Sequence, residues 1–60
     1  MTFTTVYTVA STSYTAVMSS FIVELIKGTD KDNSKTVSLD GWDCMLEEHQ
    51  GDVAAIYAAL

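Results

Sequence analysis

Charged side chains are distributed very unevenly along this chain of 60 residues. The first 26 residues contain one charged side chain, Glu24, and are rich in threonine and serine. Residues 27–35 hold all three lysines and carry a net charge of +1. The last 25 residues contain five Asp and Glu and no Lys or Arg, so the whole net charge of −5 is located there. The chain therefore has an almost uncharged part, a short mixed part and an acidic part.

The length limits the chain to one small domain, residues 1–60, because domains rarely have fewer than about 50 residues. A chain of this size buries only roughly 60% of the surface that its unfolded form exposes, so we expect marginal stability. Hydrophobic residues make up 48% and charged residues 18%, which is typical of a folded chain rather than a disordered one. A deep catalytic cleft does not fit in so small a domain, and we do not expect an enzyme.

Residues 2–10 have the pattern of a β-strand. They are mostly β-branched or aromatic, and they alternate between two faces with a period of two. One face carries Phe3, Thr5, Tyr7 and Val9, and the other carries Thr4, Val6, Thr8 and Ala10. The residues that follow, Ser11, Thr12 and Ser13, are candidates for a turn and for the N-cap of a helix.

Residues 14–26 are ambiguous, and their periodicity favours a helix over residues 13–27. All seven positions of one helical stripe are apolar: Tyr14, Val17, Met18, Phe21, Ile22, Leu25 and Ile26. Gly28 follows, where a helix commonly ends. Against a helix, the segment is rich in poor helix formers, and the pair Ser19 and Ser20 could instead turn a hairpin.

The remaining residues predict a loop and two further helices. Residues 29–35 read as an exposed loop, and Lys35–Ser38 as a short strand beside the first strand. A helix then starts at Leu39, with Ser38 or Asp40 as its N-cap, and ends at Gly51. Asp52 caps the last helix, so the acidic segment 39–60 is helical. The expected fold is an α+β domain of the order β-α-(β)-α-α, in which one strand, with or without the short second one, packs on about three helices.

The residues with the most reactive side chains do not form a recognisable catalytic or metal site. The single cysteine, Cys44, and the single histidine, His49, are too few for the paired ligands of a structural zinc site. We interpret both as structural, with a partly buried thiol, and expect no metal and no cofactor. One cysteine forms no intramolecular disulfide, which indicates a reducing compartment. A basic leader and a membrane-length apolar run are both missing, so we expect a cytoplasmic protein without membrane contact.

The acidic helix is the candidate binding site. Asp40, Asp43 and Glu47 share one helical face, with Glu48 and Asp52 at its margin. From Asp40 to Asp52 a helix rises roughly 18 Å, a length of duplex DNA that carries on the order of ten phosphate charges. Like charges at this spacing cost a few tenths of a kcal/mol each. The alternative is a solvated face, since acids favour a helix N-terminus and keep small proteins soluble.

A basic protein surface is the expected partner, because an acidic chain is repelled by nucleic acid and by anionic lipid. In its length, its acidity and its lack of a catalytic motif, the chain resembles the small phage-encoded inhibitors of bacterial defence, including anti-CRISPR proteins that imitate DNA. The resemblance covers composition and residues 40–52, without a specific motif. It implies that the carboxylates occupy the arginine- and lysine-lined surface with which a CRISPR effector or other DNA-binding protein of the bacterial cytoplasm reads DNA.

The alternative function is an interaction module that does not imitate DNA. Many large apolar residues are available for so small an interior, and the edge of the first strand carries neither proline nor lysine. Such a protein docks apolar surface on a partner or forms a homodimer. Its binding is insensitive to salt, whereas phosphate imitation weakens steeply as salt is added.

Overall fold

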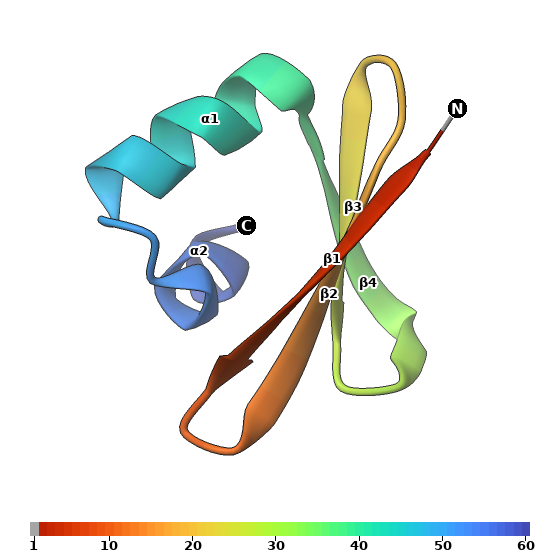
Figure 1. Cartoon of the computed structure of the whole chain (residues 1–60), viewed down its shortest axis with the longest axis vertical. Coiled ribbons are helices and arrows are strands. Elements are labelled where there is room, and N and C mark those ends of the chain that lie inside the picture. Colours follow the sequence, from red (N-terminus) through yellow and green to blue (C-terminus); the bar gives the residue numbers. More distant parts are fainter. Residues whose placement is uncertain (1) are drawn as a thin grey trace.

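The structure, a computed structural model, describes residues 2–60 and consists of a four-stranded antiparallel sheet followed by two helices (Figure 1). The strands follow one another across the sheet in chain order. The elements are β1 (Phe3–Val9), β2 (Thr12–Met18), β3 (Ile22–Lys27), β4 (Asp30–Ser38), α1 (Leu39–Glu48) and α2 (Val53–Ala59). Both helices lie against the same face of the sheet, and the opposite face is uncovered.

The first strand lies where the alternating pattern predicts it. Tyr7 and Val9 pack against the core from the face that the helices cover. The turn that follows consists of Ala10 and Ser11, both with positive φ (49° and 69°), as in the two-residue turns that match the twist of a hairpin. Ser11 lies in this turn as expected, whereas the N-cap of a helix expected within residues 11–13 is wrong, because Thr12 and Ser13 already belong to β2.

The predicted helix over residues 13–27 is also wrong, since this segment forms the hairpin of β2 and β3. The chain reverses at the two serines that the sequence marks as a break, and the Ser19 N–H donates to the Ile22 carbonyl oxygen (2.9 Å). The helical stripe arose because both faces of this hairpin carry apolar residues. Ala16 and Val23 lie outside that stripe and are fully buried, whereas Phe21, which belongs to it, is 80% exposed.

Residues 30–35 of the predicted loop are instead the first part of β4, an edge strand whose residues 30–33 are polar and exposed. Its partner is β3, and register shifts occur between Leu25 and Lys27. The prediction that Lys35–Ser38 lies beside the first strand is therefore wrong, because β1 and β4 form opposite edges of the sheet. Polar edge strands lack the apolar alternation that marks half-buried strands.

The two helices begin at the caps that the sequence indicates. The Ser38 hydroxyl accepts a hydrogen bond from the Gly41 N–H (3.0 Å), so Ser38 and not Asp40 is the N-cap of α1. Asp52 caps α2 through the Ala55 N–H (3.3 Å). Four strands precede these two helices, and the predicted order β-α-(β)-α-α is therefore incorrect.

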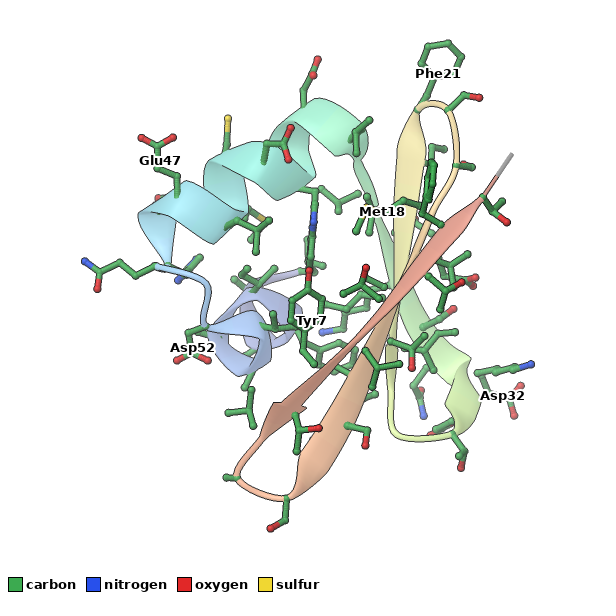
Figure 2. The ribbon with its side chains drawn as sticks, viewed as in Figure 1. Tyr7, Met18, Phe21, Asp32, Glu47 and Asp52 are labelled. Carbon is green, nitrogen blue, oxygen red and sulfur yellow. The ribbon has the colours of Figure 1, made fainter. Side chains whose placement is uncertain are left out.

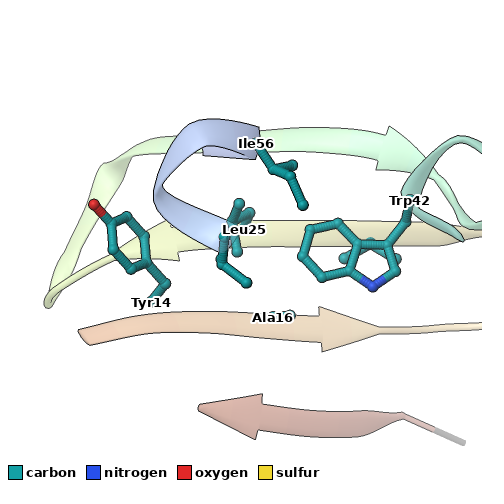
Figure 3. Close-up of a cluster of buried hydrophobic side chains, with 7 residues drawn as sticks. Tyr14, Ala16, Leu25, Trp42 and Ile56 are labelled. Atoms are coloured by element: carbon teal, nitrogen blue, oxygen red, sulfur yellow. The ribbon is translucent and has the colours of Figure 1, made fainter. Parts of the chain in front are cut away.

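The core lies between the sheet and the helices (Figure 3). Trp42 is its largest side chain, and its indole lies 6.3 Å from the ring of Tyr7, centroid to centroid. Buried side chains from β2, β3 and α2 complete it: Tyr14, Ala16, Val23, Leu25, Val53 and Ile56. The apolar side of α1 therefore faces the sheet, which leaves its other side to solvent.

Candidate functional site: the acidic face of α1

Four carboxylates project from the solvent side of α1. Asp40, Asp43, Glu47 and Glu48 are all exposed, and we call them the acidic face. Because a helix turns about 100° per residue, the first three lie within an arc of about 60°. The ten residues of α1 span about 15 Å, so the acidic face is a compact patch on one helix.

The position of Glu47 and Glu48 within α1 is electrostatically unfavourable. Both lie in the last turn, which contains no basic residue. The C-terminal end of a helix carries a partial negative charge, so a carboxylate there costs a few tenths of a kcal/mol where a lysine would stabilise. Asp40, by contrast, lies in the first turn, where a carboxylate is favourable. Helix stability therefore accounts for Asp40 and leaves Glu47 and Glu48 unexplained.

Asp52 does not extend the acidic face along one helix axis. The chain turns at Gln50 and Gly51, which both have positive φ (55° and 78°), and α2 then starts at Val53. The Asp52 carboxylate is exposed but is engaged as the N-cap of α2. The expected 18 Å line of five carboxylates is therefore shortened to roughly 12 Å, from Asp40 to Glu48.

The other charged region, formed by β3 and β4, contains three charged side chains that are hydrogen-bonded within the fold: Glu24, Asp30 and Lys35. The Lys35 ammonium donates to the Tyr57 carbonyl oxygen (2.9 Å) and lies 4.5 Å from the centroid of the Tyr57 ring. The Asp30 carboxylate accepts from the Asp32 N–H (3.2 Å) and the Asn33 amide (2.6 Å), and Glu24 accepts from the Ser34 hydroxyl (2.9 Å). Among residues 2–60, the hydrogen-bonded carboxylates are those of Glu24, Asp30 and Asp52, and none belongs to the acidic face.

Cys44 and His49 lie in different environments. Cys44 is exposed on α1, so the prediction of a partly buried thiol is wrong. His49 is half-buried and forms the C-cap of α1 through its backbone N–H. Across the described residues, His, Cys, Asp and Glu are nowhere gathered in the threes that a metal ion would need. Neither helix within residues 2–60 has the length and apolarity to cross a membrane.

An exposed aromatic residue that the sequence placed on the apolar stripe of a helix lies next to the first residue of α1. Phe21 is at the tip of the β2–β3 hairpin (Figure 2). Its carbonyl oxygen accepts from the N–H of Leu39, the first residue of α1 (2.8 Å). The two serines before Phe21 were the available signal, since a turn at that point places the next residue at a hairpin tip.

Comparison with known proteins returned no relative: the chain matches no protein-family model, no curated protein sequence and no solved structure.

Proposed function

We propose that this protein is a small inhibitor that binds a basic surface on another protein through the acidic face of α1. The observation that carries the proposal is the placement of Glu47 and Glu48 at the negative end of the helix, without a basic neighbour in that turn. These two carboxylates destabilise the helix that carries them, and we therefore assign them to an interaction outside the fold. Binding to cationic groups of a partner is that use.

Surfaces that read DNA have the matching chemistry. Arginine and lysine bind carboxylates and phosphates with the same charge-assisted hydrogen bonds. A length of about 12 Å of duplex carries roughly seven phosphate charges, and the acidic face offers four carboxylates over that length. This density supports imitation of a few phosphates over one groove, and not of a long duplex.

The proposed setting is the cytoplasm of a bacterial host, where such DNA-reading surfaces are located. An anti-CRISPR role is the example that the resemblance in composition suggests, with a CRISPR effector or another DNA-binding protein as the partner. The protein acts in this proposal by occupying the surface, not by catalysis, and it makes no direct contact with nucleic acid.

Displacement of DNA tests the proposal. A panel of bacterial DNA-binding proteins, CRISPR effector complexes included, is loaded with fluorescent target duplexes, and the chain is titrated into each. We expect displacement from at least one member, and we expect the concentration needed for it to rise steeply between low and moderate salt, because the contact is electrostatic. Failure to displace any duplex contradicts the proposal.

The double substitution Asp43→Lys/Glu47→Lys locates the contact. It replaces attraction by repulsion, and we expect the concentration for half-displacement to rise by well over tenfold. The fold is retained because Trp42 and the apolar side of α1 are unchanged. Equal displacement by a folded double variant would show that the acidic face is only solvated.

The exposed tip of the β2–β3 hairpin favours a second candidate function, docking through apolar surface. Phe21 is 80% exposed and Ile22 is 50% exposed, and aromatic side chains are the residues that most often anchor protein interfaces. In this case Phe21→Ser abolishes binding while Asp43→Lys/Glu47→Lys does not. Binding then also persists at high salt, because burial of apolar surface is not screened.

A further inference from the structure

The two edges of the sheet differ in their protection against further strand pairing. The β4 edge carries Asp30, Lys31, Asp32 and Lys35, together with the register irregularity opposite β3. Charged side chains and irregular pairing are the usual devices that keep an edge from adding another strand. The β1 edge has neither, because the chain contains no charged residue before Glu24, and β1 pairs along its full length with β2.

The hydrogen-bonding direction along β1 follows from its neighbours. The Ser13 carbonyl oxygen accepts from the Gly28 N–H (2.6 Å), so the backbone groups of Ser13 point toward β3. Polar groups alternate along a strand, and those of Tyr14 therefore point toward β1, where its partner is Tyr7. The same alternation in β1 directs the N–H and C=O groups of Thr4, Val6 and Thr8 away from β2, to the free edge.

These three residues form a self-complementary row. Val6 is the centre of β1, with three strand residues on each side. If a second copy of the chain pairs antiparallel about Val6, all seven residues of β1 find partners. Val6 then lies opposite Val6 of the second copy, and Thr4 lies opposite Thr8 of the second copy. At these positions the free N–H and C=O groups of one copy face those of the other, which is the geometry of hydrogen-bonded antiparallel pairs.

The same register covers apolar side chains that are exposed to solvent in the single chain. Phe3 is on the helix-covered face of β1 yet is 64% exposed, and Val6, on the uncovered face, is 61% exposed. Pairing about Val6 places Phe3 beside Val9 of the second copy and the two Val6 side chains against each other. An aromatic residue opposite a β-branched residue is a favourable cross-strand pair, and so are two β-branched residues opposite each other.

Charge does not oppose this association at the contact. The acidic face lies on α1, which packs over β3 and β4, whereas β1 is at the other edge.

We propose that the protein forms a homodimer in which the β1 strands of two copies pair antiparallel about Val6, so that two four-stranded sheets become one of eight strands. The two-fold axis is perpendicular to the sheet, so both α1 helices lie on the same face of the eight-stranded sheet. This inference is independent of the proposed function.

The test combines mass and amide exchange. Sedimentation equilibrium gives the oligomeric state up to millimolar chain concentration, since a strand-to-strand contact is small and reversible. Hydrogen exchange then locates the interface. We expect a concentration-dependent dimer in which the amides of Thr4, Val6 and Thr8 are protected at high concentration and exchange fast at low concentration.

Val6→Lys is the diagnostic variant, and Thr36→Lys is its matched control. Two lysines opposite each other at the centre of the interface repel, and the dissociation constant is expected to rise by about tenfold or more. Thr36 is exposed on β4, so Thr36→Lys adds the same charge at the other edge and leaves the dimer unchanged. A chain that stays monomeric at millimolar concentration overturns the inference. So does a dimer with unprotected β1 amides, or one that Thr36→Lys weakens as much as Val6→Lys does.

Discussion

The protein has two exposed charged regions, and their charges differ in what they contact. Around β3 and β4, lysines and acids are mixed, and Lys35, Asp30 and Glu24 each bond to a neighbour in the fold. On α1 the exposed charges are all negative, and two of them, Glu47 and Glu48, lie at the end of the helix where they oppose its dipole. Figure 2 shows one member of each region, Asp32 and Glu47, on opposite sides of the molecule. Hydrogen-bonded charges that stabilise the fold are therefore located around β3 and β4, and within residues 2–60 the carboxylates of α1 have no such partners.

The largest expected effect of a single change is at Tyr57 of α2, which contacts the charged region around β3 and β4. Its hydroxyl donates to the Asn33 carbonyl oxygen (2.6 Å), and its ring lies 5.8 Å from the ring of Tyr14. Tyr57→Ala removes the ring and both contacts, and we expect a loss of about 2–4 kcal/mol in the free energy of unfolding, measured in urea. Tyr57→Phe keeps the ring and should cost only about 1 kcal/mol. Equal losses for the two variants would mean that the ring contributes nothing.

A smaller effect is expected at Lys35, whose ammonium binds one of the last carbonyl groups of α2. Lys35→Met keeps most of the aliphatic chain but removes the hydrogen bond and the charge above the Tyr57 ring. We expect a loss of about 1 kcal/mol, from the lost interaction with the helix end and with the ring. Lys31→Met, at an exposed position of β4, is the control and should be nearly neutral. A neutral result at Lys35 would remove the distinction between the two charged regions.

The smallest effect, and the one of opposite sign, is expected on α1. Glu47→Lys replaces an unfavourable charge in the last turn by a favourable one and relieves repulsion from Asp43. We expect the free energy of unfolding to rise by about 0.5–1 kcal/mol at low salt, with the gain reduced at high salt. A loss of stability in this variant would show that Glu47 has a structural role after all.

The helical half of the chain could be predicted because its signals are local. Ser38 and Asp52 each act on an N–H three residues ahead, and Gly51 has the positive φ that a glycine adopts freely. Trp42, on the apolar side of α1, is buried in the core. Such caps and spacings depend on neighbours in sequence, so they can be identified without knowledge of the tertiary fold.

The sheet could not be predicted beyond its first strand, because its pattern depends on distant residues. Val17 and Ile22 lie on the uncovered face, so the apolar residues of β2 and β3 are not confined to one side, and a helical period fits them by coincidence. The fully buried Ala16 and Val23, which the helical stripe leaves out, were the contrary signal. Helical spacing predicted that Asp40, Asp43 and Glu47 share one side of α1, but it did not predict the extent of that side, since the turn at Gln50 and Gly51 separates Asp52 from it.

A matched pair of single variants tests most directly the claim that the acidic face binds a partner. Glu47→Lys and Asp32→Lys each change the net charge from −5 to −3, one on α1 and the other on β4. With a DNA-binding protein from which the wild-type chain displaces DNA, the concentration for half-displacement is measured for both variants at low salt. We expect an increase of about tenfold for Glu47→Lys and no more than a slight change for Asp32→Lys. Equal increases for the two variants, or an increase for neither, would contradict the claim.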